Sequence, residues 1–186
     1  MAYVNAYRND VFVSYAHVDD RALPGAGTGW VCTLVDALKI VLAEQLGRAE
    51  VLAVWRDLQL AGNVSVSEEV LAAVRDSALL LVVLSEGYLA SEWCDAERSG
   101  FLDLAGAATR RLFMVERMPI ERARKPAVFQ DRKGYPFWQR EHDDSPAHTL
   151  GVPAPTAAQP AYYQRLNTLG IELANELKRM RRAASG

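Results

Sequence analysis

Two residues four positions apart, Trp93 and Glu97, have the side chains best suited to chemistry in this chain. They follow a run of seven apolar residues, Ala78 to Leu84, and a polar turn that begins at Ser85. Residues four apart share one face of a helix, so a helix that begins near Ser91 points the ring and the carboxylate the same way. Ligands of open parallel sheets bind outside the carboxyl ends of the strands, which is where this pair is expected to lie.

The elements that position this pair are strands alternating with helices. The apolar run is too short to span a membrane and is typical of a strand buried on both faces of a parallel sheet. Further strands are predicted at Asn9 to Tyr15, Val51 to Trp55, Leu112 to Val115 and Tyr135 to Trp138. Four helices are predicted. The first runs from Trp30 to Leu46 and stops at Gly47, and the second follows a cap at Ser65 or Ser67. The third begins near Ser91, and the fourth runs from about Ala161 to Met180. The last helix is expected to bury Tyr163, Leu166, Leu169, Ile171, Leu173 and Leu177.

This alternation predicts an α/β fold. We expect a flavodoxin-like, doubly wound sheet of five parallel strands in the order 2-1-3-4-5, with helices on both faces. A chain of 186 residues, half of them apolar, is expected to form one domain with a large core.

Composition excludes several classes of function. The 21 basic and 23 acidic residues give a net charge of −2, which argues against binding nucleic acid through bulk charge. Two cysteines cannot form a disulfide framework, so a reducing compartment is expected. The first residues contain no apolar signal core and no run is long enough to cross a membrane. We therefore expect a soluble cytoplasmic protein with no nucleic-acid or membrane partner.

Other motifs do not support competing chemistry. Gly25, Gly27 and Gly29 have the wrong spacing for a dinucleotide fingerprint and lie too far from a strand, and no P-loop motif occurs. Ser85 stands at the end of the third strand, where a phospho-acceptor domain of this topology needs an acidic residue. The three histidines lack metal-ligand spacing, so no metal is expected. Cys94 has no nearby histidine to activate it and is interpreted as an inert thiol.

Three segments in order, DVFVSYAHVDD, VWRDLQLAGNVSVSEEVLAAVRDSALLLVVLS and YLASEWCDAE, resemble a Toll/interleukin-1 receptor (TIR) domain of the prokaryotic, NAD-cleaving type. The resemblance runs from about Asn9 to Met180, but the segment between the fourth and fifth strands matches poorly. Trp93 to Glu97 fits the family's W-x-x-x-E pattern. The loop Arg56 to Val64 matches the family's BB loop, with Ala61 in place of the usual proline. We expect residues 1–183 to form one TIR domain and residues 184–186 to be a tail at the boundary of a longer receptor or effector.

The resemblance implies an NAD+ glycohydrolase, or a cyclase, that releases nicotinamide and acts as an immune or cell-death effector. NAD+ is then a substrate and no cofactor is needed. Self-association with other TIR domains, as a homo-oligomer or filament through the loop Arg56 to Val64, is expected to activate it. Glu97 is the expected catalytic residue, only partly buried. The expected substrate-binding residues are Ser14, Tyr15, Arg56, Asp57 and Trp93.

The chemistry also has a physical basis. Nicotinamide leaves NAD+ as a neutral group, so no acid is required, and the ribose becomes an oxocarbenium-like cation. One carboxylate can stabilise that cation, and an adjacent indole can exclude water.

Plainer interpretations remain open for each residue. Glu97 could be a solvated helix carboxylate, Trp93 a core anchor, and Asp57 a cap of its own loop. Ser14 and Tyr15 could simply end a strand. The alternative function is a non-catalytic adaptor that acts through TIR–TIR contacts.

Overall fold

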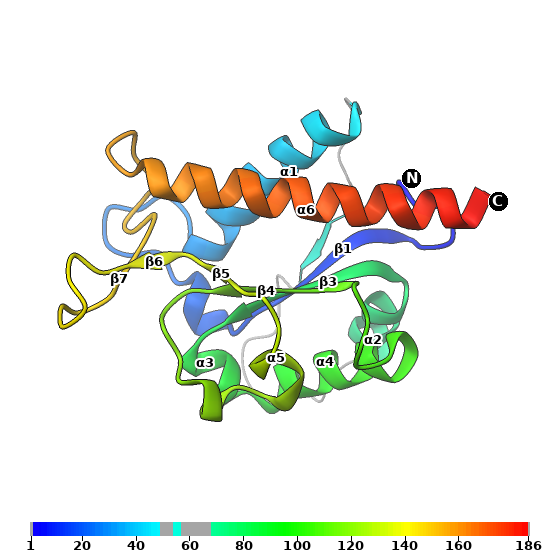
Figure 1. The fold of residues 1–186 in the computed structure, drawn as a ribbon, viewed down its shortest axis with the longest axis horizontal. Helices are drawn as coiled ribbons and strands as arrows, with labels where there is room; N and C mark the ends of the chain where they lie inside the picture. The colour runs from blue at the N-terminus through cyan, green and yellow to red at the C-terminus, as the bar shows by residue number, and fades with distance from the viewer. Residues whose placement is uncertain (1, 49–53, 57–67, 186) are drawn as a thin grey trace.

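The computed structural model describes residues 2–48, 54–56 and 68–185. Its centre is a parallel sheet of five strands in the order β2-β1-β3-β4-β5 (Figure 1). The strands are β1 (Asn9–Ser14), β2 (Val54–Arg56), β3 (Ser77–Leu84), β4 (Leu112–Glu116) and β5 (Tyr135–Pro136). All eight residues of β3 are buried, as a central parallel strand requires. The predicted α/β fold with a parallel sheet flanked by helices is confirmed.

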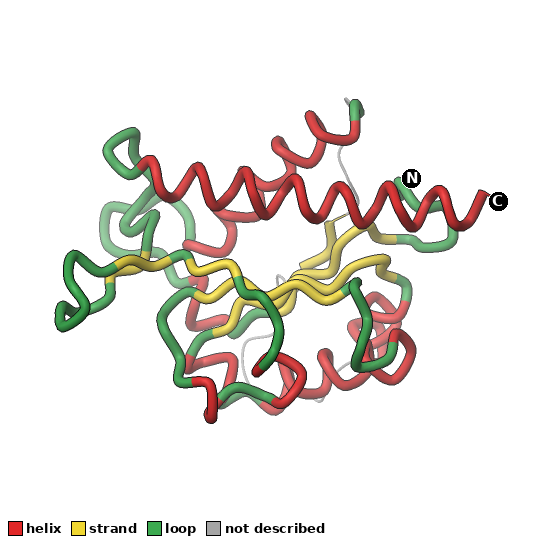
Figure 2. Tube along the Cα trace, in the orientation of Figure 1, coloured by secondary structure: helices red, strands yellow, loops and turns green. Residues whose placement is uncertain are grey.

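Helices cover both faces of the sheet (Figure 2). The long helices α1 (Trp30–Leu46) and α6 (Pro160–Ser185) lie together on one face. On the other face lie α2 (Glu68–Arg75), α3 (Glu86–Leu89), α4 (Glu92–Ala105) and α5 (Ala127–Gln130). Two 3-10 turns, η1 (His17–Asp20) and η2 (Arg122–Arg124), complete the helical elements that are described. None of the described helices is long and apolar enough to cross a membrane.

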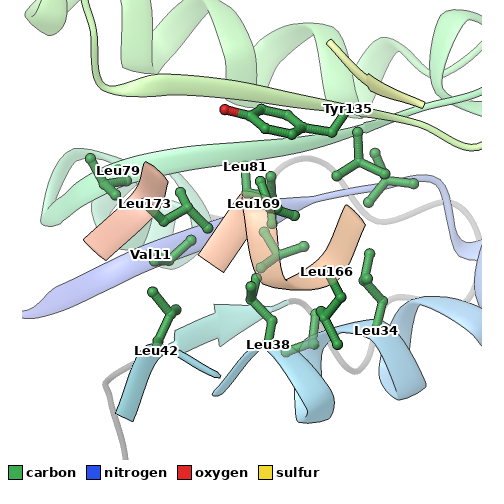
Figure 3. Close-up of a cluster of buried hydrophobic side chains, with 14 of the residues drawn as sticks. Val11, Leu34, Leu38, Leu42, Leu79, Leu81, Tyr135, Leu166, Leu169 and Leu173 are labelled. Carbon is green, nitrogen blue, oxygen red and sulfur yellow. The ribbon is translucent and has the colours of Figure 1, made fainter. Parts of the chain in front are cut away.

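The alternation of side chains along β1 divides the core into two layers. Val11 and Val13 pack toward α1 and α6, whereas Phe12 packs toward α2 and α4. Figure 3 shows the first layer, where Leu38 of α1 and Leu169 of α6 meet the central strands. The two layers fix the sheet between the helices and so fix the positions of its strand ends.

Local signals set the helix ends as expected. Gly47 follows α1 with φ of 62°. The backbone N–H groups of Gly47 and Arg48 donate hydrogen bonds to carbonyl oxygens in the last turn of the helix. Ser91 caps α4, since its Oγ accepts a hydrogen bond from Cys94 N at 3.2 Å. The expected cap at Ser65 or Ser67 lies outside the described residues, as does the beginning of the predicted strand Val51 to Trp55.

The predicted strand Tyr135 to Trp138 is shorter in the structure. Only Tyr135 and Pro136 pair with β4. Phe137 N still donates to Glu116 O at 2.8 Å, but Phe137 O accepts from Leu150 N at 2.7 Å, so the chain changes partner at this residue. Beyond it, β6 (Trp138–Gln139) and β7 (His148–Thr149) form a separate antiparallel pair.

The last helix also differs from the prediction in which tyrosine it buries. Tyr163 is 45% exposed and Tyr162 is buried at 1% exposure. The buried stripe follows positions 162, 166, 169, 173 and 177, and Tyr163 lies about 100° around the helix from it. Ile171 is only partly buried for the same reason.

Candidate functional site

Glu97 lies on α4 and is buried against the end of β1, with 2% of its surface exposed. Its Oε2 accepts a hydrogen bond from Ser14 Oγ at 2.5 Å, and its Oε1 accepts one from Trp93 Nε1 at 2.9 Å. The expectation of a partly buried carboxylate is therefore wrong. The reason is tertiary: α4 packs on the sheet so that this face of the helix lies over the last residue of β1.

Two donors from different elements orient this carboxylate. Ser14 approaches from the sheet and Trp93 from one turn earlier on the same helix. A charged group whose hydrogen bonds are already formed needs no reorganisation when charge develops near it, and burial from water strengthens its field. The arrangement is suited to stabilising a cation at the carboxyl edge of the sheet.

Cys94, beside this site, is unsuited to nucleophilic chemistry. It is 1% exposed, and burial raises the pKa of its thiol to about 12. Burial also raises the pKa of Tyr88, whose hydroxyl donates to Cys94 O at 3.3 Å. Near neutral pH both groups stay protonated, so the Cys94 thiol is not available as a thiolate nucleophile.

A second polar cluster, which the sequence did not single out, lies at the same edge of the sheet. Ser85 follows β3 and donates to Asp19 Oδ2, while Arg117 follows β4 and donates to Asp19 Oδ1 at 2.7 Å. Asp19 is buried at 4% exposure and forms an ion pair with Arg117. The signal available in the sequence was position alone, because all three residues follow the ends of strands β1, β3 and β4.

The other expected site residues are placed differently. Tyr15 is buried in the layer that faces α1 and α6, the opposite side of the sheet from Trp93, and its ring stacks on His17 at 5.9 Å. Consecutive strand residues point to opposite faces, so Ser14 reaches Glu97 and Tyr15 does not share that side. Arg56 ends β2 and pairs with Val13 through the backbone, while Asp57 lies outside the described residues.

The described residues offer no site for a metal ion. No group of three or more His, Cys, Asp or Glu side chains within residues 2–48, 54–56 and 68–185 is arranged to hold one.

These features define a doubly wound α/β domain with a buried carboxylate at the carboxyl edge of its sheet. A family model described as TIR domain matches residues 11–150. The chain belongs to the TIR domain family.

Solved structures of TIR domains are similar to this chain at low identity. The TIR domain of the Toll-related receptor TRR-2 from Hydra magnipapillata is 18% identical, with a TM-score of 0.45 over 69% of this chain and 84% of that one. The TIR domains of the activated Roq1 resistosome, which recognises the pathogen effector XopQ, are 17% identical, with a TM-score of 0.40 over 95% of this chain and 98% of that one. No curated protein matches the chain.

Proposed function

We propose that this protein cleaves the bond between nicotinamide and ribose in NAD+, with Glu97 as the catalytic carboxylate. The observation that supports this most directly is the pair of hydrogen bonds from Ser14 and Trp93 that fix both oxygens of a buried Glu97. Membership of the TIR family supports the same function.

The reaction needs no acid and no covalent nucleophile. The electron pair of the breaking C1′–N bond goes to the ring nitrogen, so nicotinamide leaves neutral and the ribose is left as an oxocarbenium-like cation. Glu97 stabilises that cation by its negative charge. Water then adds to C1′ and loses a proton, which gives ADP-ribose, nicotinamide and one proton from NAD+ and water. A cyclase would instead use a nitrogen of the adenine as the nucleophile.

Ser14 and Trp93 are positioning residues in this proposal. Each donates to one oxygen of Glu97, and together they hold the carboxylate at one orientation. Trp93 is half-buried beside Glu97, so its ring is positioned to help exclude water from the carboxylate.

Self-association is the proposed control of this activity. The loop Arg56 to Val64 would pack on a neighbouring copy to form an oligomer or filament that completes the NAD+ site. The protein would then act in the cytoplasm as an immune or cell-death effector. Activity per molecule should rise steeply with protein concentration, and activity independent of concentration down to high dilution would contradict this part of the proposal.

A non-catalytic adaptor is the second candidate, and one observation favours it. A carboxylate exposed by only 2% and bonded to a strand and to its own helix can serve simply to hold α4 on the sheet. In that case Glu97 contributes to stability and the protein has no turnover.

Glu97→Gln separates the two candidates. A glutamine keeps the shape: its amide oxygen can accept from Trp93, and its NH2 can donate to Ser14 Oγ once that hydroxyl rotates to accept. Folding should survive, whereas release of nicotinamide from NAD+ should fall by about a hundred- to a thousandfold because the charge is gone. Glu86→Gln and Glu92→Gln remove exposed carboxylates near the same helix and should keep most of the activity.

Two outcomes would contradict the proposal. If Glu97→Gln folds, associates and releases nicotinamide at the parent rate, Glu97 is not the catalytic residue. If the parent protein releases none even when it is assembled, the cleavage function is wrong.

A further inference from the structure

Two adjoining cavities lie on either side of Arg117, at the carboxyl edge of the sheet. One has a volume of about 160 Å³ and the other about 570 Å³. Arg117 and Val152 line both, so the cavities share a wall. The larger is bordered by the β6–β7 hairpin, which projects from the end of the sheet (Figure 1).

The smaller cavity has the charge of an anion site. Two arginines, Arg21 and Arg117, line it, and none of its described lining residues is acidic. Arg117 is held in place: its Nη1 donates to Asp19 at 2.7 Å and its guanidinium lies over the Trp30 ring at 5.5 Å. Its Nε is buried without a hydrogen-bond partner among the described residues. A guanidinium has five N–H donors, so one fixed by a carboxylate and an aromatic face is suited to binding phosphate oxygens with the others.

The larger cavity has the mixed lining that a nucleoside requires. Met118 and Ala147 provide apolar surface, and Gln139 and His148 provide hydrogen-bonding groups. The carboxylate of Glu141 lies at its border, and acidic residues commonly bind ribose hydroxyls in nucleotide sites. A volume of about 570 Å³ is within the range of small-molecule sites.

The cavities lie at the same carboxyl edge of the sheet as Glu97, on the side that faces α1, because their lining residues Trp30 and Val152 belong to the layer of α1 and α6. In the order β2-β1-β3-β4-β5 the direction in which successive strands are added reverses between β1 and β3. Ligands of such folds bind at that point. Ser14, at the end of β1, bonds Glu97, and Ser85, at the end of β3, bonds Asp19. Arg117 follows β4, the next strand, about 4.8 Å further along the sheet.

We propose that these two cavities bind the ADP portion of the dinucleotide, with the pyrophosphate between Arg21 and Arg117 and the adenosine against the β6–β7 hairpin. The inference rests on the proposed function, because it is the placement of nicotinamide riboside at Glu97 that directs the rest of NAD+ into these cavities.

Binding of ADP, measured by calorimetry on the intact chain, tests the site without any turnover. ADP should bind the parent at one site and more tightly than adenosine. Ala147→Phe, which fills the larger cavity, should weaken both ligands by about tenfold or more, and Ala158→Phe on the exposed surface nearby should change neither. Arg21→Gln should remove the preference for ADP over adenosine, and Arg182→Gln, an exposed arginine of α6, should preserve it.

A third pair of variants covers the case in which Ala147→Phe does not fold. Glu141→Gln removes the carboxylate that borders the cavity, and Asp143→Asn removes a carboxylate of the same hairpin that does not line it. Of these two variants, only Glu141→Gln should weaken the binding of adenosine.

The kinetics of nicotinamide release distinguish failure of this inference from failure of the proposed function. Ala147→Phe and Arg21→Gln should raise the KM for NAD+ and leave kcat nearly unchanged, while Glu97→Gln should lower kcat and leave the affinity for ADP intact. If the parent releases nicotinamide but ADP does not bind, or the cavity variants have the parent's KM, the inference is wrong and the function stands. If ADP binds as described and no nicotinamide is released, the nucleotide site stands and the cleavage function is wrong.

Discussion

Ser14 and Glu97 are 83 residues apart in the sequence and are joined by a buried hydrogen bond of 2.5 Å. This bond connects the last residue of β1 to the middle of α4. It places a carboxylate at the point where the strand order reverses, between β1 and β3. The bond also holds that carboxylate in one orientation. The function proposed for this protein depends on that orientation.

Ser14→Ala should lower the kcat for nicotinamide release by about ten- to a hundredfold, with little change in KM. The variant removes one hydrogen bond to a charged group, which is typically worth 1.5–3 kcal/mol. Trp93→Phe keeps an aromatic ring, removes the donor to the other oxygen, and should have an effect of similar size.

The Glu97→Gln background provides the control for these two variants. If Ser14 and Trp93 act through the carboxylate, neither substitution should lower the residual activity of Glu97→Gln much further. Full additivity in this background would show that the two residues act independently of Glu97. Ser145→Ala, in the surface loop of the hairpin, should have no effect on either protein.

Asp19→Asn should lower the free energy of unfolding by about 2–3 kcal/mol, measured by chemical denaturation. The substitution leaves Arg117, which is largely buried, without its ionic partner. Adding Arg117→Met should restore a large part of this loss because the unpaired charge is then removed as well. Asp131→Asn, which breaks a pair with Arg122 on the exposed surface, should change stability very little. An equal loss of unfolding free energy in Asp19→Asn and Asp131→Asn would show that the buried ion pair stabilises the protein no more than the exposed one.

Gly151→Ala should destabilise the protein by about 2 kcal/mol. Gly151 has φ of 77°, and a Cβ at this position would lie 2.7 Å and 2.9 Å from two ring carbons of the buried Tyr162. Left-handed backbone and steric overlap both oppose a side chain here. Gly27→Ala is the matched control, because a Cβ there meets nothing within 4 Å and the backbone is not left-handed. Similar melting temperatures for the two variants would contradict this expectation.

Stability should fall as the pH rises from about 9 toward 12. Burial raises the pKa of Cys94 and of Tyr162 to about 12, whereas in the unfolded chain the same groups titrate near 9 and 10. The folded state therefore binds more protons in this range, so its advantage is complete below pH 9 and is lost as the pH approaches the folded pKa values.

Tyr162→Phe should reduce this alkaline loss. The Tyr162 hydroxyl is buried with no hydrogen-bond partner among the described residues, so its removal should also leave stability at pH 7 unchanged or slightly raised. Tyr163→Phe removes the hydroxyl of the neighbouring, exposed tyrosine and serves as the matched comparison. An unchanged alkaline slope in Tyr162→Phe would contradict the assignment.

The sequence alone determined the features that depend on residues within a few turns of one another. The helix Trp30 to Leu46 begins and ends where its apolar period and Gly47 predict, and the helix with Trp93 and Glu97 on one face begins after its cap at Ser91. The apolar run before Ser85 forms the fully buried strand that its composition predicts. Periodicity, caps and strand composition act over one or two turns, so they can be read before any tertiary contact is known.

Only the tertiary structure decided what surrounds those elements. Glu97 was expected to be only partly buried, and it is 2% exposed because the packing of α4 on the sheet brings it to Ser14 at the end of β1. Asp19 meets Ser85 across 66 residues and Arg117 across 98. The β6–β7 hairpin exists because the chain changes hydrogen-bond partners at Phe137. Burial and ion pairing between residues so far apart in the sequence depend on which strands are neighbours in the sheet and on how the connecting segments fold. The local periodicity of the sequence specifies neither of these.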